Sequence, residues 1–273
     1  MDKRAFLPVK SDVIFHLFFA DERNREFLIS LLKSMLRLPE DDYQRIEIAD
    51  PHLLREFDDD KLAIIDVKLY TKNRKVIHIE IQLKVTPELK KRIILYDAKL
   101  IAEQIGSGDD YDAIKKVISI VITDEELIPA SPRYHHSFTF YDQDAKVEFS
   151  DILEIHSLEL RKLQKETDGT ELYDWAKFIA ATTEEELTMI AERNPQIGRA
   201  VVKLRELSAD ERARDLYERR EKARRDISAQ QKWAIKQSTF EIARKALQKK
   251  MSTEDIIDIT GLTVEEIENL RPM

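Results

Sequence analysis

The chain of 273 residues has no cysteine, so it forms neither disulfides nor thiolate metal sites. It has no run of about 18 apolar residues, the length that a membrane-crossing helix needs, and we therefore expect no membrane span. The first ten residues, MDKRAFLPVK, have no apolar core of the kind found in secretion signals. These absences favour a cytoplasmic protein.

The chain has fewer basic than acidic residues, with 45 Lys and Arg against 53 Asp and Glu, which gives a net charge of −8. This balance argues against a broad nucleic-acid-binding surface. The charge is uneven, however: residues 198–250 carry 16 basic and 8 acidic side chains, or +8, and the remainder carries −16. A basic segment on an acidic body is one way to bind DNA locally while staying soluble.

Residues 62–85, LAIIDVKLYTKNRKVIHIEIQLKV, contain two alternating apolar runs on either side of a polar break. Alternation with period two is typical of half-buried strands, so the segment predicts an antiparallel hairpin with one apolar and one polar face. If the turn centres on Asn73, the numbers of paired residues sum to 146. Asp66 then faces Glu80, and Lys68 faces His78.

Two carboxylates directly opposite on one sheet face repel each other at roughly 5 Å between Cβ atoms. A hard divalent cation between Asp66 and Glu80 would remove this repulsion. Gln82 points to the same side and could orient a water or a phosphate oxygen. The alternative is an ordinary solvated hairpin face on which Lys68 or Lys84 neutralises the acids.

These residues resemble the PD-(D/E)XK nuclease superfamily and, more closely, its recombination-promoting nuclease/transposase family. The pattern of that family is an Asp in one strand and Glu-x-Gln in the next, as in Asp66 and Glu80-Ile81-Gln82. Gln82 departs from the usual Lys of the superfamily but agrees with the family. Further matches lie along the chain: residues 10–15, Lys61, Arg92, Tyr96, Gln104, Gly108, Tyr111, residues 134–135 and residues 154–160.

The resemblance implies an α/β fold with a restriction-endonuclease-like mixed sheet flanked by helices, followed by a mainly α-helical C-terminal region. It also implies a DNA endonuclease that hydrolyses phosphodiester bonds with Mg²⁺, for which Mn²⁺ would substitute. Asp66, Glu80 and the backbone carbonyl of Ile81 would hold the cation, and Gln82 would position water or phosphate. The supporting residues would be Asp12, Lys61, Arg92 and Tyr96.

Several alternatives stay open at this stage. Asp12 is equally explained as a helix cap, and Arg92 as a surface partner of Glu88. The missing Lys and the acidic body also fit a catalytically weak or inactive nuclease-fold module that binds DNA or a protein partner.

Three parts are expected along the chain: a nuclease-like domain over residues 1–163, a charged helical region over 164–250 and a small helical hairpin over 251–273. The apolar run Val117–Ile122 predicts an interior strand that is buried on both faces. Residues 134–140 predict another strand. His135 and His136 lack any metal-ligand spacing and are expected to be structural.

Residues 210–250 contain neither Gly nor Pro and predict a long charged helix. The basic cluster of this helix is either a solvated face with i,i+4 ion pairs or an arm that contacts the DNA backbone. Glu265, Glu266 and Glu268 in the tail would repel phosphates, which favours docking or self-association over helix-turn-helix reading, including a homodimer through the C-terminal helices. The residues of the basic cluster that would contact DNA are Arg219, Arg220, Arg224 and Arg225.

Overall fold

The computed structural model describes residues 6–49 and 67–271, so Asp66 and Lys61 lie outside the described residues. The chain forms two compact units, one up to Tyr217 and one from Glu218 onward. The boundary expected at residue 163 therefore falls inside the first unit. The three-part division of the chain stays a prediction.

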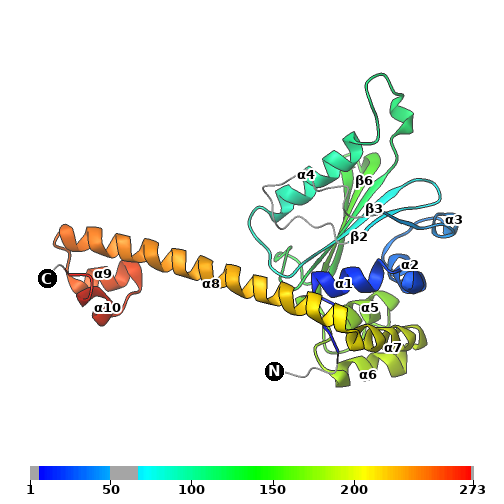
Figure 1. The fold of residues 1–273 in the computed structure, drawn as a ribbon. Helices are drawn as coiled ribbons and strands as arrows, with labels where there is room; N and C mark the ends of the chain where they lie inside the picture. Colours follow the sequence, from blue (N-terminus) through cyan, green and yellow to red (C-terminus); the bar gives the residue numbers. More distant parts are fainter. Residues whose placement is uncertain (1–5, 50–66, 272–273) are drawn as a thin grey trace. The chain divides into compact units, whose positions relative to one another are not determined.

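A mixed sheet forms the centre of the first unit and confirms the expected fold class (Figure 1). The order of its six described strands is β1-β2-β3-β4-β6-β5, in which β3, β4 and β6 are parallel and the other neighbours antiparallel. All seven residues of β4 are buried, as its apolar sequence predicts. The strands are β1 (Glu47–Ala49), β2 (Val67–Tyr70), β3 (Val76–Gln82), β4 (Val117–Thr123), β5 (His135–Asp142) and β6 (Val147–Glu159).

The hairpin of β2 and β3 has the predicted register. Val67 pairs with Ile79, and Lys68 pairs with His78. A buried carboxylate, Asp42, fixes the turn by accepting hydrogen bonds from Asn73 at 3.0 Å and from Lys75 at 2.7 Å. The alternation of the sequence was therefore sufficient to predict which residues share a face in the described part of this hairpin.

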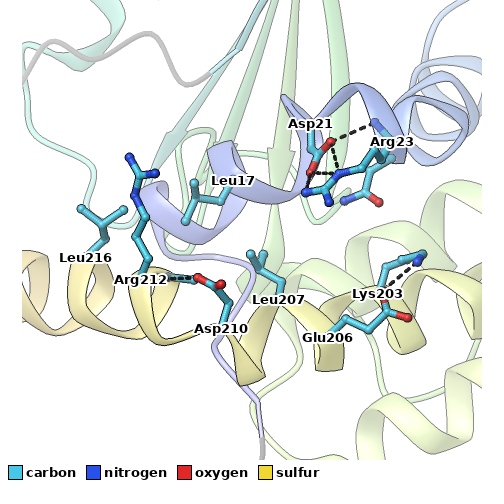
Figure 2. Close-up of a pocket in the computed structure, with 11 residues that line it drawn as sticks. Leu17, Asp21, Arg23, Lys203, Glu206, Leu207, Asp210, Arg212 and Leu216 are labelled. Carbon is cyan, nitrogen blue, oxygen red and sulfur yellow. Dashed lines mark hydrogen bonds and ion pairs between the residues drawn. The ribbon is translucent and has the colours of Figure 1, made fainter.

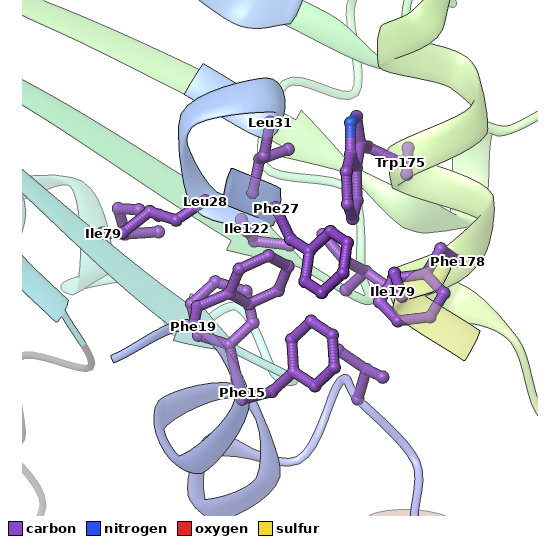
Figure 3. Packing of buried hydrophobic residues seen from close by; sticks show 14 of the residues in the cluster. Phe15, Phe19, Phe27, Leu28, Leu31, Ile79, Ile122, Trp175, Phe178 and Ile179 are labelled. Atoms are coloured by element: carbon purple, nitrogen blue, oxygen red, sulfur yellow. The ribbon is translucent and has the colours of Figure 1, made fainter. Parts of the chain in front are cut away.

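One face of the sheet carries a dense aromatic core. Ile79 and Ile122 pack there against helices from both ends of the first unit, namely α1 (Asp12–Phe19), α2 (Arg25–Met35) and α5 (Glu171–Ala180). Figure 3 shows the rings of Phe15, Phe19 and Phe27 beside Trp175 and Phe178. The indole N–H of Trp175 donates to the Ser30 hydroxyl at 3.0 Å, which satisfies the most polar atom of this core.

The other face of the sheet lies under α4 (Leu89–Ala102), the crossover helix between the parallel strands β3 and β4. Leu89 and Ile93 pack with Val121, and Leu100 packs with Val117. The alternative of an ordinary solvated face on the hairpin is wrong, because His78 is 1% and Glu80 4% exposed. Helices cover both faces of a parallel sheet, and β3 belongs to the parallel part.

The further elements of the first unit are η1 (Glu22–Asn24), α3 (Glu40–Tyr43), η3 (Tyr111–Ala113), η4 (Leu160–Lys162), α6 (Glu184–Arg193) and α7 (Pro195–Ala209). Thr183 and Glu186 form a capping box at the start of α6. It satisfies backbone N–H groups that the first turn of a helix leaves unpaired.

The long charged helix is present as α8 (Glu211–Gln248). In the second unit its C-terminal part packs with α9 (Thr253–Thr260) and α10 (Val264–Glu268) around a core that includes Ala243, Ile256 and Ile267. The side chains of Ser252 and Thr263 cap α9 and α10. No helix in the described ranges is long and apolar enough to cross a membrane.

Candidate nuclease site

Glu80 and Gln82 share one face of β3 near its carboxyl end, and α4 brings Arg92 to them. Gln82 Nε2 donates to Glu80 Oε1 at 2.7 Å. Arg92 Nη2 donates to the same oxygen at 2.7 Å. Ligands of open α/β sheets bind beyond the carboxyl ends of parallel strands, so this trio lies where a substrate site is expected.

Arg92 therefore pairs with the predicted catalytic carboxylate and not with Glu88. Its Nε is buried and has no hydrogen-bond partner in the described part of the chain. Tyr96, one turn further along α4, is half-buried. Their roles toward a phosphate stay predictions.

Three buried polar side chains lie behind this trio and were missed from the sequence. Ser119 Oγ donates to Asp97 Oδ1 at 2.6 Å and is also hydrogen-bonded to His78 Nε2. His78 Nε2 is 3.4 Å from the same Asp97 oxygen. We call His78, Asp97 and Ser119 the buried triad.

Burial perturbs the acid and the base of the buried triad in opposite senses. Burial, opposed by the hydrogen bond from Ser119 and assisted by the negative charge of Glu80, raises the pKa of Asp97 to about 7. Burial also lowers the pKa of His78 to about 4, with a smaller contribution from Lys68. At neutral pH His78 is therefore neutral, and the charged form of Asp97 is disfavoured relative to that of an exposed acid.

Two signals in the sequence could have located the triad. Asp97 falls on the inward stripe of α4, between Ile93 and Leu100, where an acid is out of place unless it has a partner. Ser119 interrupts an otherwise apolar interior strand. A helix that carries an inward acid next to a strand that carries an inward hydroxyl predicts a buried hydrogen bond.

The other predicted site residues are placed less directly. Asp12 is the first residue of α1 and is buried, and its Oδ1 accepts a hydrogen bond from the Val13 N–H at 2.9 Å. Lys10 pairs at 3.0 Å with Asp124, just after β4, so the start of α1 lies near the carboxyl end of this strand. A role of Asp12 in the site stays a prediction, as does that of the Ile81 carbonyl.

The described residues fit a divalent cation in their donor chemistry. Glu80 and Gln82 offer the carboxylate and amide oxygens that hard cations prefer. Arg92 Nη2 already meets the negative charge of Glu80 at 2.7 Å, so a cation would have to share or replace this contact. Within residues 6–49 and 67–271 no group of three or more His, Asp or Glu side chains could hold a metal. The role of Asp66 as a ligand lies outside these ranges and stays a prediction.

The histidines of β5 and β6 are held by each other and by nearby acids. His135 Nε2 is 2.9 Å from His156 Nδ1, and His156 Nε2 is 2.8 Å from Glu154. His136 Nδ1 is 3.2 Å from Glu159. These contacts join the two strands, in keeping with the structural role expected for His135 and His136.

A hollow of about 510 Å³ lies on the α1 side of the first unit, lined by α1, η1, α7 and the start of α8 (Figure 2). Its charged walls are largely self-paired: Arg23 binds Asp21 at 2.6 Å, and Lys203 binds Glu206 at 2.7 Å. Glu80 points to the opposite face of the sheet. The hollow is thus separate from the candidate site and offers few uncommitted charges to a ligand.

The mixed sheet, the crossover helix over one face and the Glu-x-Gln on β3 define a nuclease fold of the PD-(D/E)XK class. A family model described as PD-(D/E)XK nuclease family transposase matches residues 9–234, and the chain belongs to this family. A second model, described as the C-terminal HTH domain of the Rpn/YhgA-like nuclease family, matches residues 236–272. Neither a curated protein nor a solved structure matches the chain.

These matches confirm the resemblance to the recombination-promoting nucleases and correct the interpretation of the tail. The preference against a helix-turn-helix was wrong, because residues 236–272 match the model of such a domain. The acidic side chains of α10 led to that preference. The domain, however, is defined by how α8, α9 and α10 pack around their small core, and surface charge does not determine that packing.

Proposed function

We propose that this protein is a metal-dependent DNA endonuclease that hydrolyses phosphodiester bonds. The observation that carries the proposal is the contact of Glu80 with Gln82 and Arg92 beside the carboxyl end of β3, in a chain of a nuclease family. The three groups supply a carboxylate, a neutral amide and a positive charge. A carboxylate can hold a cation, and the amide and the positive charge can bind water or phosphate oxygens beside it.

Asp66, Glu80 and the backbone carbonyl of Ile81 would hold Mg²⁺ or Mn²⁺. We include Asp66 because it directly precedes Val67, which pairs with Ile79, the neighbour of Glu80. When bound, such a cation lowers the pKa of a bound water and offsets the negative charge that develops on the phosphate. Asp12 and Lys61 would support the site from outside this set.

Gln82 would orient the attacking water or a phosphate oxygen through its amide group. It cannot accept the proton of the water as a base, because a side-chain amide does not titrate in this pH range. Arg92 suits a phosphate oxygen, since a guanidinium makes charge-assisted hydrogen bonds to such groups. Tyr96 lies one turn further on the same helix and would contact the same strand of DNA.

The test is nicking of supercoiled plasmid with Mg²⁺ or Mn²⁺. Glu80→Gln and Asp66→Ala should each lower the rate at least a hundredfold, because each removes a charged ligand of the cation. Glu88→Gln is the matched control, since Glu88 is an exposed acid at the start of α4. Equal nicking by wild type, Glu80→Gln and Asp66→Ala would reject the proposal.

DNA would also be bound by the C-terminal unit, as the helix-turn-helix match and the basic stretch of α8 indicate. Glu221 pairs with Arg224 at 3.0 Å, so part of this stretch has intrahelical partners. Replacing the four arginines by Gln should lower the slope of log affinity against log salt by about 0.9 for each phosphate that the variant no longer neutralises. The four are Arg219, Arg220, Arg224 and Arg225. An unchanged slope would exclude them.

A cytoplasmic location and a homodimer through the C-terminal helices also belong to this proposal. A dimer would suit an enzyme that cuts both strands of a duplex. Light scattering of the full chain, compared with a chain that ends at residue 217, measures whether the second unit carries the association.

A second candidate is a nuclease-fold module that binds DNA or a protein without cutting. The occupation of Glu80 Oε1 by Arg92 and Gln82 favours it, because both contacts compete with a cation. Calorimetric titration with Mg²⁺ separates the two. Metal binding that is lost in Glu80→Ala supports the enzyme, and DNA binding that ignores the metal supports the module.

A further inference from the structure

Glu80 is a buried acid, and a buried charge is stable only next to an opposite charge or a cation. In the structure Arg92 supplies that charge at 2.7 Å. A second acid, Asp97, lies close enough for the charge of Glu80 to raise its pKa. Without Arg92, Glu80 would be a buried acid close to a second buried acid, Asp97.

The hydrogen bond between Arg92 and Glu80 has the geometry of a contact that can be exchanged for another one. Only Nη2 of Arg92 is bonded to the carboxylate, and its buried Nε has no hydrogen-bond partner in the described chain. Arg–carboxylate pairs are frequently bidentate, with two parallel hydrogen bonds, and this pair is not. An unsatisfied buried donor is unfavourable, so a position with a partner for Nε would be preferred.

Arg92 can leave Glu80 without any movement of the helix that carries it. Its side chain is one-quarter exposed, whereas that of Glu80 is 5% exposed. Leu89 and Ile93, on either side of Arg92, are buried and anchor α4 to β4. A change in the side-chain torsions of Arg92 is therefore sufficient to turn its guanidinium toward solvent or toward a bound phosphate.

We propose that Arg92 is the counter-charge of Glu80 in the metal-free protein and gives up this carboxylate when a divalent cation binds. The released guanidinium then binds a phosphate oxygen of the DNA. Arg92 thus opposes the binding of the cation alone and favours the binding of cation and DNA together. The inference rests on the proposed metal site and adds a specific coupling between its two ligands.

The test is calorimetric titration of the metal-free full chain with Mn²⁺ in the absence of DNA. Arg92→Ala should bind Mn²⁺ about tenfold more tightly than wild type, because coupling between sites typically changes affinity 5- to 150-fold. Arg92→Lys keeps the positive charge and should remain near wild type. Lys91→Ala is the matched control, since Lys91 is the exposed neighbour on the same helix.

A second measurement is thermal unfolding, first without metal and then with Mn²⁺. Thermal unfolding in EDTA should show Arg92→Ala less stable than both wild type and Lys91→Ala, and Mn²⁺ should raise the unfolding temperature of Arg92→Ala more than that of wild type. This readout also shows whether the variant folds.

Two results would overturn the inference in distinguishable ways. If wild type binds Mn²⁺ through Glu80 but Arg92→Ala binds it equally or more weakly, the exchange is wrong and the metal site stands. If neither wild type nor Arg92→Ala shows Mn²⁺ binding that Glu80→Gln removes, the proposed metal site itself fails.

Discussion

Replacement of Asp97 by Asn tests the buried triad through the pH dependence of stability. The pKa of Asp97 is about 7 in the folded chain, against an ordinary value of 3.8. An acid with a raised pKa holds its proton more tightly in the folded state than in the unfolded state. The free energy of unfolding therefore falls as the pH rises from about 4 to about 7 and is level above that.

The size of the effect follows from the two pKa values. One pKa unit corresponds to about 1.4 kcal/mol, so Asp97 lowers the stability of the wild type by about 2.5 kcal/mol between pH 5 and pH 8. The groups that face it are Glu80, Ser119 and His78. The lowered pKa of His78 gives a slope of opposite sign, which wild type and variant share.

The assay is urea denaturation at pH 5 and pH 8 of wild type, Asp97→Asn and the exposed control Glu103→Gln. The Asn side chain keeps an acceptor for Ser119 but adds a buried donor, which costs about 1–3 kcal/mol at both pH values. The diagnostic quantity is therefore the change between the two pH values. Relative to wild type, Asp97→Asn should gain about 2.5 kcal/mol on going to pH 8. Parallel pH profiles for all three proteins would refute the reasoning.

Three further substitutions test the fold, each by urea denaturation of the full chain. Phe178→Ala should cost about 3–5 kcal/mol, because the ring is fully buried against Trp175; a loss below 1 kcal/mol would contradict that packing. Asp42→Ala should cost about 3 kcal/mol, since it leaves the Nζ of Lys75 without its carboxylate; an unchanged midpoint would show that other bonds fix the turn. Gly261→Ala should cost about 1 kcal/mol, because Gly261 has a φ of 67° with no atom within 4 Å of an added Cβ; a loss above 3 kcal/mol would indicate a steric clash.

The strands and their register were predictable from local pattern. The apolar run Val117–Ile122 is nearly uninterrupted, which predicts burial on both faces of the sheet. All residues of β4 are buried. The alternation around Asn73 fixes the pairing of Val67 with Ile79. Both inferences depend only on the two-residue period of a strand and on which side chains avoid water.

The surroundings of the site were not predictable in the same way. An alternating polar residue such as Glu80 has the same sequence pattern whether water or a helix covers it. Whether Glu80 is exposed or covered depends on α4, which begins seven residues after β3 and carries its own polar groups inward. From sequence spacing alone, Glu88 could not be excluded as the partner of Arg92. The pairing of Arg92 with Glu80 can be seen only once α4 is placed over the sheet as the crossover helix.

The aromatic core joins the beginning and the late part of the first unit. Phe19 is present almost as soon as synthesis starts, but Trp175 and Phe178 arrive some 155 residues later. Until they are synthesised, the face of the sheet that carries Ile79 and Ile122 is incompletely covered. The growing polypeptide therefore exposes apolar surface after most of the first unit has left the ribosome. A fragment that stops at residue 163 should consequently aggregate or require a chaperone, although all the described strands of the sheet are encoded in it.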